Sequence, residues 1–295
     1  MSIWDDIGKT FRSGNSLMRL IYVNIIVFLL ISIGSIIGYL LNNQTLSLNI
    51  LNWFSVPSSI KAFLLRPWTL VTYMFTHKDI LHILFNMLWL YWFGTIFLEY
   101  LDQKKLVAVY LLGGISGAFV YIFSFNIFPV FNQVVTESVA IGASASVLAI
   151  VVAIAAYVPE YSVNLFLLGR IKIKYVALAI FILTSVLDFS VNSGGKLAHI
   201  GGAMFGYIYT FSLRRGHDLG KGLNKIIDFF ATIFKPRKKL RVTYKKSKTE
   251  YEYNKARAAH QEQINRILEK ISKGGYDSLT KEEKDLLFRE SQKRN

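Results

Sequence analysis

The sequence predicts an all-α membrane protein, in which a bundle of six transmembrane helices is followed by a basic cytoplasmic helical tail. Two observations predict this class. The 295 residues are 53% hydrophobic with a mean hydropathy of +0.36, which a soluble domain rarely sustains because its surface must be polar. The apolar residues also come in long blocks, and about 20 such residues cross a bilayer core.

Six apolar blocks define the predicted spans. They run from Arg19 to Leu41, Ile80 to Leu101, Leu106 to Ile127, Glu137 to Val158, Ile171 to Phe189 and Leu197 to Leu213. The expected organisation is a cytoplasmic segment (1–18), the six-span domain (19–214), an amphipathic and basic juxtamembrane segment (215–249) and a small helical tail (250–295). Residues 1–18 lack the features of a cleaved signal peptide, so we expect span one to stay as an anchor.

Lys and Arg in the short loops set the predicted orientation. They cluster before span one, between spans two and three, between spans four and five, and after span six. This bias predicts a multi-pass protein with both termini in the cytoplasm. The long loop 42–77 holds several aromatic residues, which predicts anchoring in the headgroup region.

The net charge of +15 sits mostly in the tail, which has 22 Lys and Arg against 11 Asp and Glu from Arg214 onward. Nucleic-acid binding is the alternative explanation of such a charge. A basic segment directly after a span favours apposition to anionic lipid instead, and we expect no nucleic-acid partner. The chain has no cysteine, which excludes disulfides, thiolate metal sites and a cysteine nucleophile.

The tail pattern predicts three helical or basic stretches. Residues Lys221–Phe234 have apolar residues at helical spacing and predict a helix on the membrane surface. Lys235–Lys248 is basic and predicted to be disordered. A polar helix is expected over Tyr251–Ser272, ended by Gly274 and Gly275, and the TKEE run Thr280–Glu283 has the form of a capping box that opens a last short helix.

Polar residues inside spans are costly, so three segments are candidates for function. HILFN in span two places His82 and Asn86 on one helix face, although such residues also join helices by hydrogen bonds. In span four, GASAS (Gly142–Ser146) contains Ser144, and small residues there are also a common packing motif. In span six, AHIGGAMFG (Ala198–Gly206) contains His199, which by itself fits a structural donor, a metal ligand or a proton relay.

Together the three segments supply the parts of one reaction. A serine hydroxyl becomes a good nucleophile when a base takes its proton, and His199 is a suitable base for Ser144. Amide hydrolysis also needs donors that face the oxyanion, which His82, Asn86 and the Ser144 N–H can supply. Ser146 is two residues further, about 200° around the helix, so it should face away from His199. Asp188 is expected in an exposed interfacial position.

The set HxxxN, GxSx and AHxxGxxxG, in this order on six spans, resembles the rhomboid family of intramembrane serine proteases over residues 15–215. The resemblance implies that Ser144 is the nucleophile and His199 the base, with His82 and Asn86 lining the oxyanion hole. It also implies structural roles for His77, Gly142, Gly202 and Gly206. Gly94 and Glu99 resemble the end of the family's second span, with the acid shifted by one position. The sequence departs from the family at Ala145, where glycine is usual, and at Leu148, where some members have tyrosine.

The resemblance implies a serine endopeptidase that cleaves transmembrane helices of single-span or polytopic proteins near the outer face, with span five as a lateral gate. It implies no metal and no other cofactor, and the bacterial type implies the bacterial inner membrane. One alternative is a pseudoprotease that binds membrane helices without cleaving them. The other is a transporter or channel that uses the polar residues as a path, which would predict symmetric broken helices that the sequence lacks.

Overall fold

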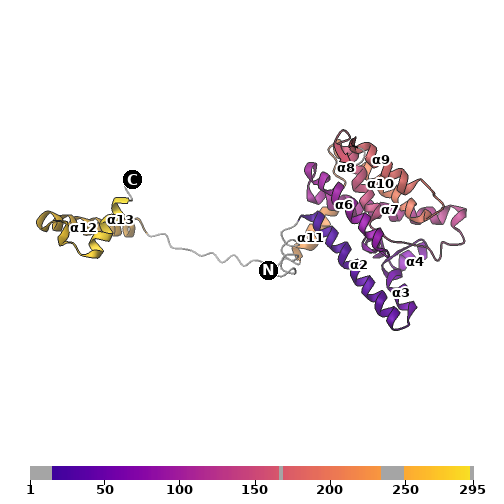
Figure 1. The fold of residues 1–295 in the computed structure, drawn as a ribbon, viewed down its shortest axis with the longest axis horizontal. Coiled ribbons are helices and arrows are strands. Elements are labelled where there is room, and N and C mark those ends of the chain that lie inside the picture. The colour runs from indigo at the N-terminus through magenta and orange to yellow at the C-terminus, as the bar shows by residue number, and fades with distance from the viewer. Residues whose placement is uncertain (1–14, 166–168, 234–248, 293–295) are drawn as a thin grey trace. The chain divides into compact units, whose positions relative to one another are not determined.

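The computed structural model describes residues 15–165, 169–233 and 249–292, and these are mostly helical (Figure 1). The chain divides into two units, residues 1–235 and 236–295, which are described separately. Most of the predicted N-terminal segment and the predicted basic run Lys235–Lys248 lie outside the described residues. Nothing below depends on how the two units are arranged relative to each other.

A helix is found at each predicted span of the first unit. These helices are α2 (Ser16–Leu40), α6 (Ile80–Tyr100), α7 (Gln103–Ile127), α8 (Ser144–Tyr157), α9 (Ile173–Ser185) and α10 (Ser193–Arg214). Among the described residues, α2, α6 and α7 are long and apolar enough to cross a membrane, whereas α8 and α9 are shorter apolar helices. The chain is therefore a helical protein with three membrane-span candidates.

The predicted start of span four at Glu137 is wrong, because α8 begins only at Ser144. The preceding residues form a short strand β2 (Val139–Ala140), which pairs antiparallel with β1 (Val56–Pro57). Gly142 follows with a φ of +115°, a conformation that side chains disfavour. This segment is apolar because it is partly buried. Its backbone polar groups form hydrogen bonds without forming a helix: the Gly142 N–H, for example, donates to the Tyr73 carbonyl at 2.9 Å.

The centre of the bundle is formed by α7, α8 and α10, each of which packs against the other two. Close approach depends on small residues on both neighbours. A Cβ built on Gly202 or Gly206 of α10 would collide with the α8 carbonyl oxygens of Ala145 or Ala149. Such small residues let helix backbones approach in membranes, where van der Waals packing replaces the hydrophobic effect.

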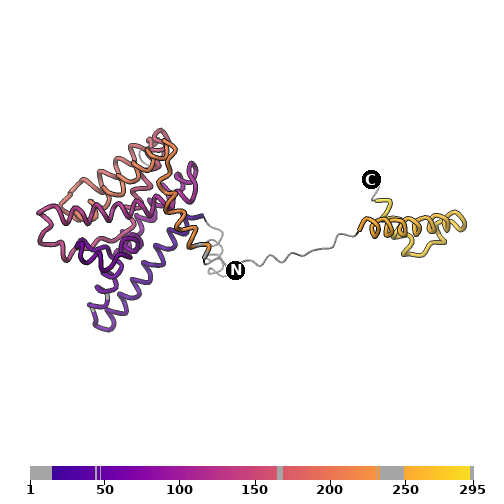
Figure 2. The backbone as a smooth tube through the Cα atoms, turned by 180° about the vertical axis from the view of Figure 1, so that it is seen from behind, coloured from indigo at the N-terminus to yellow at the C-terminus, as the bar shows by residue number. Residues whose placement is uncertain are grey.

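The loop before α6 is more structured than the predicted interfacial loop. It contains α3 (Gln44–Phe54), α4 (Ile60–Leu65), α5 (Thr69–Thr72) and the 3-10 turn η1 (Tyr73–Phe75). Figure 2 shows α2 running along one flank of the unit and turning back into α3. Trp53 and Trp68 remain partly exposed with ring centroids 5.0 Å apart, whereas Tyr73 is buried and its hydroxyl donates to the Gly114 carbonyl at 2.5 Å.

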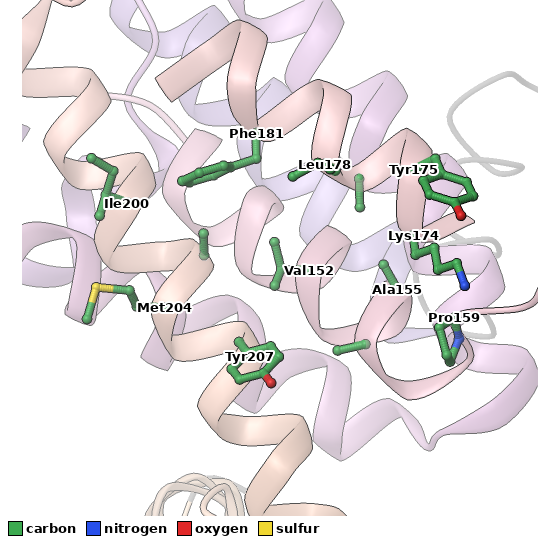
Figure 3. Close-up of a pocket in the computed structure, with 13 residues that line it drawn as sticks. Val152, Ala155, Pro159, Lys174, Tyr175, Leu178, Phe181, Ile200, Met204 and Tyr207 are labelled. Atoms are coloured by element: carbon green, nitrogen blue, oxygen red, sulfur yellow. The ribbon is translucent and has the colours of Figure 1, made fainter. Parts of the chain in front are cut away.

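Helix α9 lies over α8 and α10, and an apolar groove of ≈ 610 Å³ runs between the three helices (Figure 3). Between α8 and α9 the chain forms a hairpin of β3 (Ser162–Leu165) and β4 (Gly169–Lys172). Hydrogen bonds from Lys172 and Lys174 lower the pKa of the exposed Glu160 carboxyl to about 2. Glu160 therefore stays ionised at any ordinary pH and pairs with Lys172 and Lys174 beside the start of α9.

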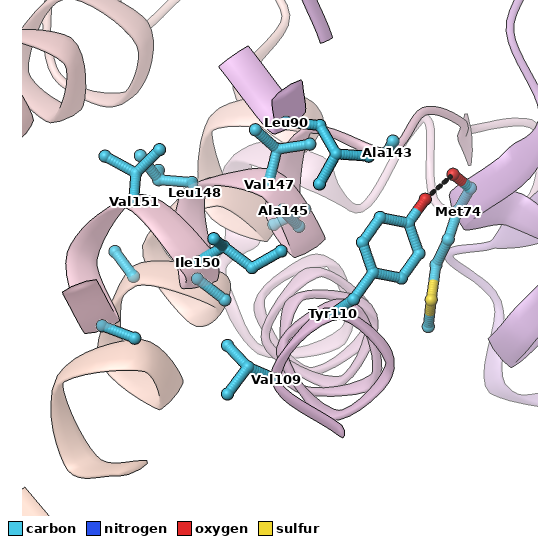
Figure 4. Close-up of a cluster of buried hydrophobic side chains, with 14 of the residues drawn as sticks. Met74, Leu90, Val109, Tyr110, Ala143, Ala145, Val147, Leu148, Ile150 and Val151 are labelled. Atoms are coloured by element: carbon cyan, nitrogen blue, oxygen red, sulfur yellow. Dashed lines mark hydrogen bonds between the residues drawn. The ribbon is translucent and has the colours of Figure 1, made fainter. Parts of the chain in front are cut away.

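The buried core between α6, α7 and α8 lies directly beside the start of α8 (Figure 4). Leu90, Val109 and Ile150 are among its fully buried side chains. The Tyr110 hydroxyl on α7 donates to the Met74 carbonyl at 3.1 Å and receives a 3.0 Å hydrogen bond from the buried Asn24 amide of α2. This network ties α2, α7 and the loop before α6 together.

The remaining elements lie mostly in the C-terminal part of the chain, where the sequence predicts helices. Helix α11 (Lys221–Ile233) follows α10, and η2 (Pro129–Phe131) follows α7. The second unit contains α12 (Glu250–Gly274), η3 (Tyr276–Ser278) and α13 (Lys281–Gln292). Gly275 follows α12 with a φ of +71°. The predicted capping box is present, since the Thr280 N–H donates to Glu283 at 2.8 Å and the Glu283 N–H donates back to the Thr280 hydroxyl at 3.4 Å.

Candidate active site

Ser144 and His199 form a hydrogen-bonded pair between α8 and α10, with 2.7 Å between the Ser144 Oγ and the His199 Nε2. The other ring nitrogen, Nδ1, lies 3.1 Å from the Thr184 carbonyl oxygen on α9. A carbonyl only accepts, so Nδ1 must carry the ring proton. Nε2 is then left with a lone pair facing the serine hydroxyl, which is the tautomer that a general base needs.

Ser144 is the first residue of α8. The first intrahelical hydrogen bond runs from the Val147 N–H to the Ala143 carbonyl, so the amides of Ser144, Ala145 and Ser146 precede the helical ladder. The helix N-terminus adds a positive partial charge. When the Ser144 Oγ attacks a carbonyl carbon, the carbonyl oxygen that becomes an anion would therefore lie near backbone N–H donors.

His77 connects the loop before α6 to the start of α8. Its Nε2 accepts from the Ala143 N–H at 3.3 Å and from the Asn86 Nδ2 at 3.3 Å. Its Nδ1 lies 3.4 Å from the Phe75 carbonyl and donates to it. The ring is fully buried, so it has no water to bond to and its protein partners fix its tautomer. The same hydrogen bonds hold the turn before Ser144 against α6.

Asn86 and His82 contact the same turn in different ways. Asn86 donates to the His82 carbonyl at 3.0 Å as well as to His77, so both protons of its amide have partners. The His82 ring packs on Gly142, where an added Cβ would lie 2.7 Å from the ring. Both side chains are thus near the Ser144 turn, and only Asn86 lines the cavity beside the serine.

A small cavity of ≈ 50 Å³ borders the pair. Ser144, His199 and Asn86 supply its polar side, and the apolar side includes Trp89, Leu148 and Ile180. A water molecule needs only about 15 Å³ by this measure, so the cavity has room for the water that hydrolysis consumes. A ligand pocket usually has at least about 300 Å³, so a peptide enters only if the surrounding helices move.

The two departures from the family pattern have different structural consequences. The Ala145 methyl points at α7, where Gly117 provides space: a Cβ built there would lie 2.7 Å from it. The extra methyl is therefore accommodated by a glycine on the neighbouring helix. Leu148 is buried and lines the cavity, so it offers His199 an apolar contact and no aromatic ring.

Ser146 and Asp188 lie as expected. Ser146 is fully buried and faces Gly114 on α7, on the side of α8 away from His199. Asp188 follows α9 in an exposed position with a φ of +49°. The sequence reasoning did not identify the Thr184 carbonyl, because any residue carries a backbone carbonyl. Trp89 was also missed, although its spacing of three from Asn86 places it on the same helix face.

Replacement of His77 by leucine should lower stability. The substitution leaves the buried Ala143 N–H without an acceptor and frees the Asn86 amide, and an unsatisfied buried donor costs about 1–3 kcal/mol. Thermal unfolding in detergent measures the loss, with His217→Leu as the matched control because His217 is exposed. Equal midpoints for the two variants would show that His77 does not hold this turn.

Comparison with known proteins identifies the family. The helical fold and its three membrane-span candidates define a membrane protein, and the model of the Rhomboid domain matches residues 65–216, just over half of the chain. The chain belongs to the rhomboid family, whose members are generally intramembrane serine proteases. Residues 248–293 match DUF6576, a family of unknown function.

Three curated relatives are similar in the same region. Presenilin-associated rhomboid-like protein A, mitochondrial, from Danio rerio is 28% identical over 151 residues, which are 49% of this chain and 36% of the relative. The Rattus norvegicus presenilin-associated rhomboid-like protein, mitochondrial, is 28% identical over 159 residues, 49% and 37% of the two chains. RHOMBOID-like protein 12, mitochondrial, from Arabidopsis thaliana is 29% identical over 163 residues, 51% and 48%.

The chain thus spans less than half of the length of each of these relatives. All three are named as mitochondrial proteins, so they give no support to the predicted bacterial inner membrane. A membrane location is what the apolar helices indicate.

Proposed function

We propose that this protein is an intramembrane serine endopeptidase that cleaves transmembrane-helix substrates with a Ser144–His199 dyad. The observation that carries the proposal is the 2.7 Å contact between the Ser144 Oγ and the His199 Nε2, together with the Thr184 carbonyl on Nδ1. The geometry supplies nucleophile and base in the correct tautomer, and a serine of this kind needs neither a metal nor another cofactor.

The reaction proceeds in two halves. His199 Nε2 takes the hydroxyl proton while the Ser144 Oγ attacks the scissile carbonyl carbon, and the tetrahedral oxyanion accepts hydrogen bonds from the Ser144 N–H. Nε2 then gives its proton to the leaving amine, the C–N bond breaks and an acyl-serine remains. A water molecule, deprotonated by His199, attacks the acyl carbon and releases the new carboxyl end and the free serine.

Asn86 and His82 complete the oxyanion site in this proposal. Both amide protons of Asn86 have protein partners, so one of them must exchange from the His77 Nε2 or the His82 carbonyl to the oxyanion. This exchange stabilises the transition state more than the ground state. The negatively charged oxyanion attracts the Asn86 amide proton more strongly than the neutral carbonyl of the bound substrate does.

The proposed substrate is a helix in a single-span or polytopic membrane protein. A helix hides its carbonyls in internal hydrogen bonds, so it must unwind locally before attack. The ≈ 50 Å³ cavity is too small for that segment, and α9 lines it through Ile180 and Thr184. Movement of α9 as a lateral gate would admit the substrate. The proposal keeps six spans, a cut near the outer face and both termini in the cytoplasm.

Anionic lipid is the proposed partner of the basic segment after α10. In α11, the exposed residues Ile226, Phe229 and Phe230 accompany Lys221 and Lys225, as expected of a helix lying on a charged membrane surface. We propose no nucleic-acid partner.

Incubation of the purified full chain with a model single-span substrate tests the function. Mass spectrometry should find one cut within or beside the substrate's membrane segment, and Ser144→Ala should reduce its rate by about 10³-fold or more, as loss of such a nucleophile does. Cleavage that persists in Ser144→Ala would refute the assignment.

The second candidate is a pseudoprotease of the same fold. Leu148 is the observation that favours it, because no aromatic ring supports His199 from α8. A folded protein that binds substrate helices but does not react with a fluorophosphonate at Ser144 would be this pseudoprotease.

A further inference from the structure

The groove between α8, α9 and α10 is separate from the dyad cavity. Its lining includes Val152, Leu178, Phe181 and Met204, and Lys174 is the single charged side chain among the described residues that line it (Figure 3). Helix α9 contributes to both spaces. Ile180 and Thr184 line the dyad cavity, whereas Leu178 and Phe181 line the groove. Whatever fills the groove therefore contacts the helix that also supports His199.

The end of the groove at Lys174 lies beside a group of tyrosines. Tyr100 ends α6, Tyr157 ends α8, and Tyr161 and Tyr175 lie on either side of the β3–β4 hairpin. The rings of Tyr100 and Tyr161 meet edge to face with centroids 6.0 Å apart. Tyrosines gathered at one level of a membrane bundle mark the headgroup region, so the groove opens there at its charged end.

This end of the groove also has an excess of positive charge. Lys172 and Lys174 share Glu160 as their ionic partner, with 2.5 Å between the Lys172 Nζ and a carboxylate oxygen. The Arg214 guanidinium donates to the Tyr157 carbonyl at 2.8 Å. Lys172, Lys174 and Arg214 therefore outnumber the acids at this end, which are Glu160 and the Glu99 carboxyl hydrogen-bonded to Tyr161. The net positive charge attracts an anion at headgroup level.

We infer that this groove is a binding site for one anionic phospholipid, with an acyl chain between α8, α9 and α10 and the phosphate at Lys174. The apolar lining matches a hydrocarbon chain, and the cation at one end matches a headgroup. The positive charge at Lys174 complements a phosphate, which an apolar membrane helix lacks, so the lipid is the better occupant.

Titration of phosphatidylglycerol into the detergent-purified full chain, followed by native mass spectrometry, tests the site. The Ser144→Ala background separates lipid binding from proteolysis, so the result does not depend on the proposed function. We expect one phosphatidylglycerol to bind more tightly than phosphatidylcholine, by about fivefold per base that it contacts.

Matched substitutions on α9 locate the acyl chain. Leu178→Trp fills the groove and should weaken phosphatidylglycerol binding by about tenfold. Leu183→Trp makes the same change at a residue of α9 that does not line the groove, and it should leave binding unchanged; the two leucines are 53% and 64% exposed. Met204→Trp repeats the test from α10, at a side chain that is also 53% exposed.

Two charge variants should change the affinity for phosphatidylglycerol in opposite directions. Lys174→Gln should weaken phosphatidylglycerol binding by about fivefold, whereas Glu160→Gln removes the competing acid and should strengthen it by a similar factor. Weakening by both variants would mean a structural role for the ion pair and would overturn the proposal. Equal binding of the two lipids, equal effects of Leu178→Trp and Leu183→Trp, or displacement of the lipid by a substrate helix would overturn it as well.

Discussion

Fluorophosphonate labelling of the full chain is expected to disappear in Ser144→Ala and to persist in Ser146→Ala. Both serines lie in the first turn of α8, but the Ser144 Oγ contacts His199 and borders the cavity, whereas Ser146 is fully buried against α7. Only Ser144 has a base within hydrogen-bonding distance. Gel fluorescence of the labelled protein, with a folding check by size exclusion, measures the difference.

His199→Ala in the same assay should slow labelling by about 10³-fold or more, because the hydroxyl then has no base to activate it. Ser146→Ala serves as the matched control for changes to α8. If labelling moved to Ser146, or if His199→Ala reacted as fast as the wild type, the dyad would be wrong. Unlabelled but folded wild-type protein would favour the pseudoprotease.

Gly202→Ala is expected to give the largest loss of stability among single methyl additions. The new Cβ collides with the Ala145 carbonyl oxygen of α8, a helix that is packed against both α7 and α10. Overpacking of this kind costs about 3 kcal/mol, and the separation of α8 from α10 also moves Ser144 away from His199. The thermal unfolding temperature and the rate of substrate cleavage should therefore both decrease in this variant.

Gly222→Ala is the control for this prediction. It adds the same methyl in α11, where nothing lies within 4 Å of the new Cβ. Because alanine is the better helix former by about 1 kcal/mol, this variant should be as stable as the wild type or slightly more so. A Gly202→Ala protein that unfolds at the wild-type temperature would show that α8 and α10 are not in such close contact.

The positions of the helices followed from composition, because the cost of exposing polar groups to lipid applies along each whole span. The ends of α2, α6, α7 and α10 lie within about four residues of the prediction, which is the usual accuracy for helix boundaries. The start of α8 did not follow, because Val139 and Ala140 are apolar in a strand as well as in a helix. Hydropathy does not distinguish buried extended backbone from a span.

Contacts between side chains of distant segments were predictable only where each side chain is a polar residue within an apolar segment. Ser144, His199, His82 and Asn86 are polar residues in apolar segments, and the structure brings them to one turn. The pairing of Asn86 with His77 was not predictable, because it depends on how the loop before α6 folds back. Likewise, Gly117 explains Ala145 only after α7 and α8 are seen in contact.

The hydrogen bond from His199 Nδ1 to the Thr184 carbonyl fixes an order of events in the proposed reaction. The acceptor belongs to α9, the helix that we propose moves when a substrate enters. While α9 is displaced, nothing on that helix selects the tautomer, and the imidazole can turn a proton rather than a lone pair towards Ser144. The substrate therefore enters first, and Ser144 is activated only after α9 has returned to His199. A membrane helix that holds α9 open would occupy the site without being cut.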